Sequence, residues 1–382
     1  SALSQSPIYD ALGQVATRAQ ARGEYRSVEA LAAQMRELAI KSRLQGVYIT
    51  RSSLMLAEAY RQLGKLALAE QLVKDTLVIA REQVGAESED VTLLLIEQAA
   101  IAVALGRFAE AQQVLQIALA TKPGSSGALQ ICILNSQIRL WLMWGKFKEA
   151  ASALQTVTVL LSAPDKQKSM ENALAVYLRG SLAQMKGKYD EAIALQSQAV
   201  EIAASVVGKQ NPNYADMLFN SASAYRMASK FSKAEAALNE GLAILQNAYG
   251  GDYPGIAAAS ASLAEVYCDE GKYAQAEVLA KKALTMTERL LGDRSADLPS
   301  SKIILARIYR FQGKYKEAEN LCKESIAMVE RMGGPRYFAM ACGLNNLGEI
   351  YQDEGRSREA EAQFKQALSI VKETFGDEHP DF

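Results

Sequence analysis

Residues 271–276 read GKYAQA, and this short pattern decides the fold because it recurs along the chain. In each copy a glycine is followed by Lys or Arg, an aromatic residue, two variable residues and Ala. Four further clear copies are GRFAEA at Gly106, GKFKEA at Gly145, GKYDEA at Gly187 and GKYKEA at Gly313, and weaker copies begin at Gly23, Gly64, Ser229 and Gly355. We call the first residue of each copy the anchor.

The anchors are evenly spaced. From residue 64 onward they lie 42, 39, 42, 42, 42, 42 and 42 residues apart, and Gly23 lies 41 residues before Gly64. A fixed period of this length is the sequence signature of a repeat architecture, in which each period is one supersecondary unit.

Each period predicts helix, turn, helix and loop. The first helix ends in patterns such as LAEVY at Leu263 and LARIY at Leu305, and the anchor glycine then supplies the positive φ that a helix C-terminus commonly needs. We expect the second helix to end 21 residues after the anchor, at another glycine in seven of the nine units. These glycines are Gly85, Gly127, Gly208, Gly250, Gly292, Gly334 and Gly376.

Small residues fall in two columns of the repeat. Seven residues before an anchor the residue is Ala or Gly, with Ile138 the exception, and five residues after it the residue is Ala, with Val28 the exception. Tyr or Trp commonly stands four residues before the anchor, on the same helical face as the first column. These columns predict positions where two helices approach closely.

Composition agrees with an all-α protein. Of the 382 residues 49% are hydrophobic, only 7% are aromatic and eight are proline. The formal net charge is -1, so we expect no general attraction to nucleic acid or to an anionic membrane. The four cysteines are scattered and do not suggest a disulfide framework, which favours a reducing compartment. The sequence contains no apolar run of 18 residues, and we expect a cytoplasmic protein.

The sequence offers little for catalysis. His379 is the single histidine, and we expect it in an inter-repeat loop. The cysteines lack metal-ligand spacing, and no phosphate-binding G-x-x-x-x-G-K-[ST] motif occurs. We therefore expect no enzymatic activity, no cofactor and no metal site.

The small-large-small pattern resembles the tetratricopeptide repeat (TPR) family from about residue 8 to residue 373. The 42-residue period and segments such as GKYAQAEVLAKKALTMTERLLGD at 271–293 are most similar to the kinesin-light-chain subclass. The resemblance implies an all-α, right-handed α-α superhelix of about nine helix pairs. Because GDEHPDF at 376–382 reads as the loop into a further unit, we expect the natural chain to continue. The expected units are 8–45, 46–87, 88–129, 130–166, 167–210, 211–252, 253–294, 295–336 and 337–378.

The same resemblance implies where a partner binds. In this family the first helix of each pair lines the concave face, and the ligand-facing columns lie 10, 9, 6 and 3 residues before the anchor. Asparagines are poor helix formers, so their recurrence in these columns favours a role in binding, although they can also solvate an open groove or bond to the next repeat. The candidate residues are Asn135, Arg139, Tyr177, Ser181, Phe219, Asn220, Ser223, Arg226, Arg307, Arg310, Asn345, Asn346 and Glu349.

These features predict a protein-interaction scaffold that holds an extended or helical segment of a partner in the concave groove. An amide can donate to and accept from a peptide backbone, and arginine binds carboxylates with two donors, so we expect a protein or peptide partner of acidic character. The alternative is a regulatory or self-assembly array that serves an effector domain outside these residues.

Overall fold

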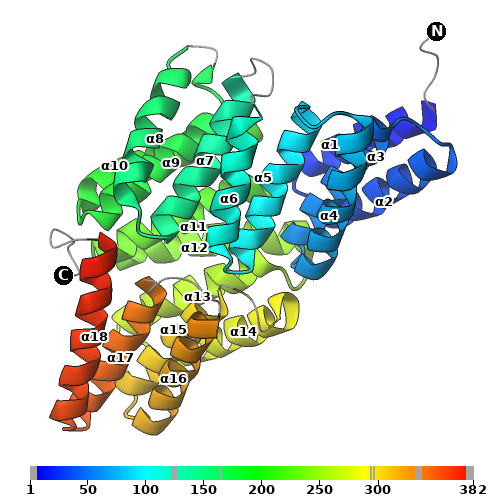
Figure 1. Ribbon diagram of the computed structural model, residues 1–382. Coiled ribbons are helices and arrows are strands. Elements are labelled where there is room, and N and C mark those ends of the chain that lie inside the picture. Colours follow the sequence, from blue (N-terminus) through cyan, green and yellow to red (C-terminus); the bar gives the residue numbers. More distant parts are fainter. Residues whose placement is uncertain are drawn as a thin grey trace.

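The computed structural model describes residues 7–121, 127–163, 166–292, 295, 297–331 and 338–375. These residues form eighteen helices and no strand, arranged as nine consecutive helix pairs (Figure 1). The pairs are α1 (Pro7–Ala21) with α2 (Tyr25–Lys41), α3 (Gly46–Gln62) with α4 (Leu66–Gln83), α5 (Glu89–Ala104) with α6 (Phe108–Ala120), α7 (Gly127–Met143) with α8 (Phe147–Leu160), α9 (Met170–Met185) with α10 (Tyr189–Val207), α11 (Pro212–Met227) with α12 (Phe231–Tyr249), α13 (Pro254–Asp269) with α14 (Tyr273–Leu291), α15 (Leu298–Phe311) with α16 (Tyr315–Arg331), and α17 (Phe338–Asp353) with α18 (Ser357–Phe375). The predicted all-α superhelix of helix pairs is confirmed.

The anchors turn the chain as expected. The eight anchor glycines have φ between 69° and 78°, and Ser229 adopts φ 56° in the remaining unit. At Gly271 the turn is closed by two backbone bonds, from the Gly271 amide to the Cys268 carbonyl at 3.0 Å and from the Lys272 amide to the Tyr267 carbonyl at 2.8 Å. This is the Schellman arrangement, in which a left-handed residue satisfies the last carbonyls of the helix.

One expectation about the second glycine is wrong. Gly127 does not end a helix: it is the first residue of α7, and α6 already ends at Ala120. Thr121 ends α6 instead, since its hydroxyl donates to the Ala118 carbonyl at 2.7 Å and lies 3.0 Å from the Thr92 hydroxyl. The glycines at 85, 208, 250 and 292 follow second helices with positive φ, whereas Gly334 and Gly376 lie outside the described residues.

The two small-residue columns are buried where paired helices meet. Their alanines have at most 4% of their surface exposed, and Ile138 and Val28, the two exceptions, are also fully buried. At Gly348 a Cβ atom would lie 2.6 Å from the Phe364 ring of the paired helix, and at Gly180 it would lie 2.8 Å from Gln196. A larger side chain at these points would push the helices apart, so the prediction of close contact is confirmed.

In four units a basic residue one position after the anchor pairs with a carboxylate that lies six residues after the preceding anchor. Arg107 pairs with Glu70 at 2.6 Å, Lys314 with Glu277 at 3.0 Å, and Lys65 with Glu29 at 2.6 Å. We call this pair the inter-repeat clasp. It explains why the recurring motif carries Lys or Arg beside the glycine.

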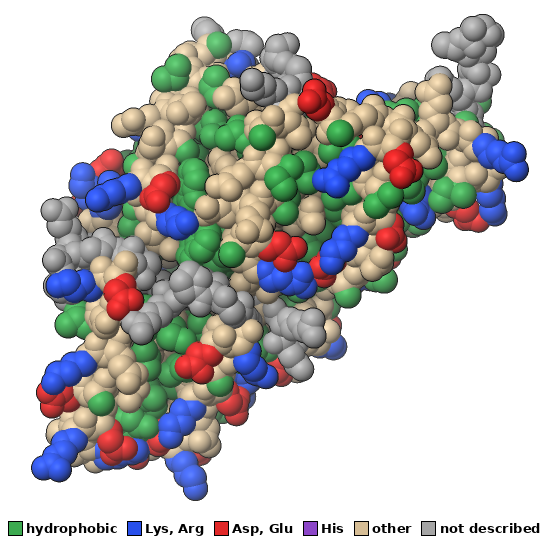
Figure 2. Space-filling model, in the orientation of Figure 1, with side chains coloured by type: hydrophobic (Ala, Val, Ile, Leu, Met, Phe, Trp, Pro, Cys, Tyr) green, Lys and Arg blue, Asp and Glu red, His purple; other side chains and the backbone are tan. Residues whose placement is uncertain are grey.

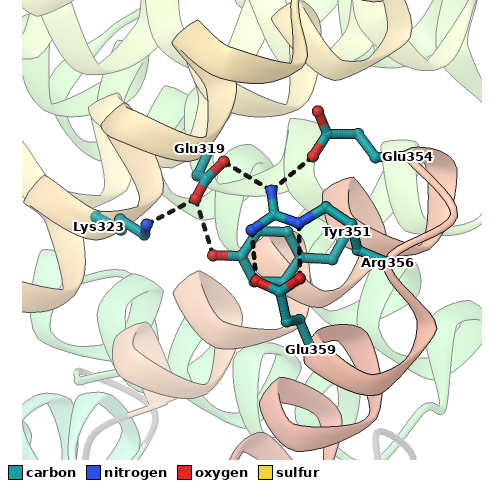
Figure 3. Close-up of polar contacts among 6 residues, drawn as sticks. All are labelled: Glu319, Lys323, Tyr351, Glu354, Arg356 and Glu359. Carbon is teal, nitrogen blue, oxygen red and sulfur yellow. Dashed lines mark hydrogen bonds and ion pairs between the residues drawn. The ribbon is translucent and has the colours of Figure 1, made fainter.

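Figure 3 shows the last clasp in full. Arg356 in the turn before α18 reaches Glu319 of α16 at 3.0 Å, and its guanidinium lies 3.9 Å from the centroid of the Tyr351 ring. The Tyr351 hydroxyl also donates to Glu319 at 2.9 Å, and Lys323 reaches the same carboxylate at 2.6 Å. The clasp therefore ties α16, α17 and α18 together around one carboxylate.

The array also closes on itself. Figure 1 shows α1–α10 as an upper row and α13–α18 as a lower row. Tyr25 at the start of α2 stacks on Tyr249 at the end of α12, with ring centroids 6.4 Å apart, and Tyr249 stacks on Tyr253 at 3.8 Å. Nearby, the Asn211 amide donates to the Ala21 carbonyl at 2.5 Å. Residues about 190 positions apart thus form one interface.

A second contact across the two rows is apolar. Val329 at the end of α16 belongs to the same buried core as Leu94 of α5 and Leu140 of α7. In a simple solenoid each unit touches only its neighbours, which is what the repeat period alone leads one to expect. That expectation is wrong here, because successive turns of the superhelix pack against each other.

The small-residue column can be tested in α10. Ala192 is fully buried, whereas Ala194 on the same helix is exposed. Ala192→Leu should lower the free energy of unfolding by about 1 to 3 kcal/mol, because it forces three extra carbon atoms into a close helix contact. Thermal and denaturant unfolding would measure the change. Ala194→Leu is the matched control and should be nearly neutral, so an equal loss from both variants would contradict the register described above.

The clasps predict a pH dependence. The Arg107 hydrogen bond lowers the pKa of Glu70 to about 2, and hydrogen bonds led by that from Lys281 lower the pKa of Glu277 to about 2. Burial opposes ionisation of Glu319, but hydrogen bonds from Lys323, Arg356 and Tyr351 outweigh it, and its pKa also falls to about 2. Because these values lie below the ordinary pKa of 4.5, the stabilisation is fully present above about pH 4.5 and is lost as the pH falls toward 2.

Glu319→Gln should therefore lower stability by about 1 kcal/mol at pH 7 and reduce the slope of melting temperature against pH between 5 and 2. Glu361 occupies the same column in the last pair, where its carboxylate pairs only with Lys365 of its own helix among the described residues. Glu361→Gln is the control and should leave the melting curve nearly unchanged. Identical pH profiles for the two variants would show that the clasp does not stabilise the array.

Candidate partner-binding face

The first helices of the pairs form a continuous inner layer. Each contacts the first helix of the next pair, so that α3, α5, α7, α9, α11, α13, α15 and α17 follow one another. Elements that approach each other this way lie on the inner side of a curved solenoid, the side that solenoids commonly use for recognition. All thirteen candidate residues lie on these helices.

The arginines in the C-terminal half of this layer already have partners. Arg226 of α11 pairs with Asp269 at 2.8 Å and with Glu265 at 3.3 Å, both on α13. Arg307 of α15 reaches the same Asp269 at 2.7 Å. Arg310 pairs with Glu349 and, at 2.9 Å, with Asp353 of α17. These ion pairs link α11 to α13 and α15, and α15 to α17.

The groove is therefore not cationic in this half. Three arginines face four carboxylates, and no positive charge is left over for an acidic partner. Figure 2 shows basic and acidic side chains interspersed over the face of the molecule that it draws. The physical reason is that the ligand-facing columns carry both signs, since Glu265 and Glu349 occupy the column of Arg307, six residues before an anchor.

The asparagines of α17 also bond within the chain. The Asn345 amide donates to Glu349 at 3.1 Å, and the Asn346 amide donates to the Cys342 carbonyl at 2.9 Å. Both are bonds to a residue four positions away on the same helix. Asn345 is exposed, whereas the side-chain oxygen of Asn346 is buried and accepts no hydrogen bond from the described residues.

In the N-terminal half the inner layer holds an enclosed ion pair. Arg61 of α3 reaches Glu97 of α5 with two nitrogens, at 2.6 and 3.2 Å, and Glu97 is 7% exposed. Glu58, one turn before Arg61, accepts from the Gln20 amide at 2.5 Å. Burial raises the pKa of Glu58, and the positive charge of Arg61 opposes that rise. These groups hold α1, α3 and α5 together.

Arg139 of α7 and Asp216 of α11 behave differently. Both side chains are exposed to water, and neither forms an ion pair or hydrogen bond with a residue that the structure describes. Yet the surrounding protein lowers the pKa of Arg139, and the positive charge of Arg61 lowers it further. Surrounding protein likewise raises the pKa of Asp216 to about 6, opposed by the charge of Arg139. Both side chains are thus exposed and unpaired, and the surrounding protein disfavours their charged forms.

The other candidates divide between buried and open positions. Asn135 is 2% exposed and its amide lies 3.5 Å from the Glu171 carbonyl, so it packs between α7 and α9. The Ser181 hydroxyl donates to the Tyr177 carbonyl at 3.2 Å on α9, and the Ser223 hydroxyl accepts from Gln184 at 2.9 Å.

On α11 the face is partly open. The Phe219 ring packs on Gly241, where a Cβ atom would lie 2.4 Å from it. Asn220 is partly exposed, and its amide has no hydrogen-bond partner among the described residues. Asp216 lies on the same helical face, one turn before these two residues. This face of α11 therefore presents the Asp216 carboxylate and the Asn220 amide, neither of which forms a hydrogen bond with a described residue.

Asp216, Glu97 and Glu265 are not among the residues predicted from the sequence. Glu97 and Glu265 lie nine and six residues before their anchors, so applying the ligand-facing columns to every unit identifies them. Asp216 lies thirteen residues before Ser229, three residues outside the columns but on the same helical stripe. Extending the ligand-facing columns by one helical turn is the sequence signal that could have identified Asp216.

Among the described residues, no helix combines the length and the apolar character that a membrane span requires. The same part of the chain brings together no group of three or more His, Cys, Asp or Glu side chains that could hold a metal ion.

Solved structures share the architecture. A Rap protein complexed with competence and sporulation factor matches with a TM-score of 0.70 and 12% sequence identity, over 97% of this chain and 99% of that one. A kinesin light chain from P. anserina with nearly identical TPR-like repeats is 22% identical over 53% of this chain and 96% of its own, with a TM-score of 0.42. BtubC (BKLC) from P. vanneervenii is 21% identical over 62% of this chain and 92% of its own, also with a TM-score of 0.42.

Family models identify the repeat. One tetratricopeptide-repeat model matches residues 171–247, 233–287 and 255–331, a second matches 344–381, and a third matches 50–74, together more than half of the chain. No curated protein matches the sequence. This repeat fold is typically non-enzymatic. The chain therefore belongs to the tetratricopeptide-repeat family, and its closed array of helix pairs is a protein-interaction scaffold.

Proposed function

We propose that the protein binds an extended or helical peptide segment of a partner protein along its inner layer, around Arg139, Asp216 and Asn220. One observation carries the proposal: Arg139 and Asp216 are exposed to water, and neither forms an ion pair or a hydrogen bond with a described residue. The neighbouring charges Arg61 and Glu97 neutralise each other. A bound partner would supply ion-pair or hydrogen-bond partners for Arg139 and Asp216.

The free-energy cost of leaving these two charges unpaired supports a role for them in binding. A charge that is ringed by protein and lacks a counter-ion reduces stability, because the protein replaces part of its hydration without supplying a partner. Strongly perturbed ionisable groups without a structural partner are candidates for a binding site. Arg61 and Glu97 show that this fold can pair charges in the same layer, so pairing is not prevented by the architecture.

The chemistry of the partner follows from the groups on offer. Arg139 presents a guanidinium to an acidic side chain or a C-terminal carboxylate, and Asp216 presents a carboxylate to a basic group. The Asn220 amide can bond to a peptide carbonyl or amide. We therefore propose a segment that carries charges of both signs, in place of one that is acidic throughout. The Rap protein of similar fold was solved in complex with competence and sporulation factor, which supports a ligand-bearing role for such an array.

A peptide selected from a phage-displayed random library on the immobilised protein tests this proposal. By isothermal titration, Arg139→Ala should weaken the selected peptide at least about tenfold, within the range for losing a hydrogen bond to a charged group. Asn220→Ala should weaken it less. Lys282→Ala, on the second helix α14, is the control and should change nothing. Failure to select any peptide, or an affinity that is indifferent to Arg139, would contradict the proposal.

Asp216 gives an independent test through pH. Because its pKa of about 6 lies above the ordinary value of 3.8, its ionisation costs stability above about pH 6, and this cost vanishes below about pH 3.8. Asp216→Asn should therefore raise the melting temperature at pH 7.5 and leave it unchanged near pH 3.5. The selected peptide should bind less tightly to the wild type below pH 6. A variant that is destabilised at pH 7.5 would mean that Asp216 has a structural partner.

A further inference from the structure

A cavity of about 720 Å³ lies where the array closes on itself. One side of it is formed by the α1–α2 turn and the start of α2, which supply Arg22, Glu24 and Arg26. The other side is formed by the ends of α10 and α12 and by the loop after α10, which supply Lys209 and Tyr249. Tyr249 is also the central ring of the closure stack. The cavity is therefore complete only while the two sides are in contact.

The charged side chains that line this cavity are mostly basic. Among the described residues they are Arg22, Arg26 and Lys209, with Glu24 as the one carboxylate. The Glu24 carboxylate lies 2.6 Å from the Arg22 guanidinium and neutralises it. Arg26 and Lys209 are exposed, and neither forms an ion pair or a hydrogen bond with a described residue. Two positive charges are thus left unpaired at one cavity of a chain whose formal net charge is -1.

The placement of Arg26 is unfavourable for the helix that carries it. It lies in the first turn of α2, where the helix dipole disfavours a cation. Its side chain extends to the other side of the cavity, since a Cβ atom on Gly251, just after α12, would lie 3.8 Å from a terminal nitrogen of Arg26. The position of this guanidinium therefore calls for an explanation outside the helix.

The loop that supplies Lys209 also differs from its counterparts. Second helices are followed by a glycine of positive φ at Gly85, Gly208, Gly250 and Gly292. After three of these glycines an Asp or Glu occurs within three residues, whereas the loop after Gly208 reads KQNPN at 209–213 and contains no acid. The loop that borders the cavity is thus the one that lacks negative charge.

We propose that this cavity binds a small organic phosphate with at least two negative charges, and that the bound phosphate stabilises the closed array. A phosphate group concentrates nearly two charges, which matches two unpaired cations, and a guanidinium binds phosphate oxygens with two donors. Val207, Ile244 and Ala248 give the cavity an apolar wall for the organic part of the ligand. Its volume is typical of small-molecule sites.

The link to closure follows from where the two cations originate. Arg26 belongs to the first helix pair, and Lys209 lies more than 180 residues later in the chain, on the other side of the contact. An anion held between them favours the arrangement in which the two sides meet, because only that arrangement offers both cations. The site is distinct from the inner layer and does not depend on the function proposed there.

Isothermal titration of the full chain with ADP and with inorganic pyrophosphate tests the site, in about 0.15 M salt to screen weak surface attraction. ADP should bind once per chain and more tightly than pyrophosphate, because its ring can lie against the apolar wall. Arg26→Gln should weaken ADP binding about tenfold or more, and Lys209→Gln about fivefold or more. Lys282→Gln on α14 is the matched control, and Arg139→Ala tests the inner layer; both should leave the affinity unchanged.

Hydrogen exchange measures the link to closure. ADP should slow amide exchange in α2 and α12 of the wild type but not of Arg26→Gln. Tyr25→Ala removes one ring of the closure stack without changing a residue that lines the cavity, so it should weaken ADP binding about threefold or more. Arg26 and Lys209 are exposed, so their substitutions leave the fold intact.

Four results would overturn the proposal. The first is the absence of saturable binding by both probes, or an ADP affinity that is indifferent to Arg26 and Lys209. The second is sulfate binding as tightly as ADP, which would leave only a general anion site. The third is a phosphoserine peptide that binds more tightly than ADP, which would assign the cavity to a modified partner segment. The fourth concerns stability without ligand, where both glutamine variants should keep or raise the melting temperature because each removes an unpaired charge. A lower melting temperature with unchanged ADP affinity would mean that the cations serve the carbonyl ends of α10 and α12.

Discussion

The close approach of two helices at columns of small side chains is the contact on which the remaining structure depends. Ala57 and Ala69, or Ala264 and Ala276, are buried where the two helices of one pair meet. With so little side chain between the backbones, each pair is a rigid unit of fixed geometry, and the near-constant period repeats that geometry. The curvature of the array follows, since a small rotation between identical units accumulates into a superhelix.

Polar contacts then fix how one unit sits on the next. The clasp places a cation of one unit on a carboxylate of the preceding unit and lays it over a tyrosine ring, as with Arg356, Glu319 and Tyr351. Such a pair adds little stability at an exposed site. Here it is partly buried and shared among three helices, so it also fixes the orientation of one unit relative to the next. The inner-layer pairs of Arg226 and Arg307 with Asp269 do the same on the opposite side of the units.

Closure of the superhelix changes the environment of the side chains on the inner layer. In an open solenoid the concave side is a groove in contact with bulk water, and its charges are screened. Here the stack of Tyr25, Tyr249 and Tyr253 joins the two ends of one turn, and the surrounding protein disfavours the charged forms of Arg139 and Asp216. Charges in such a place interact more strongly with a partner than charges on an open surface. The same enclosure makes them costly while they remain unpaired, which is why they are the strongest candidates for binding.

The sequence by itself determined the helix pairs, their turns and their close contacts, because all three depend on residues within one period. Positive φ at the anchors, burial of the alanine columns and the all-α architecture could be predicted from spacing and side-chain size alone. The last residue of a helix could not always be predicted: Thr121 ends α6 by bonding to Thr92 of another helix, so Gly127 was free to begin α7. Tertiary structure alone decided which charges are paired, since Arg226, Arg307 and Arg310 meet acids 38 to 43 residues away along the chain. It also decided the closure, which joins residues about 190 positions apart and leaves no periodic signal, because it depends on rotation summed over several units.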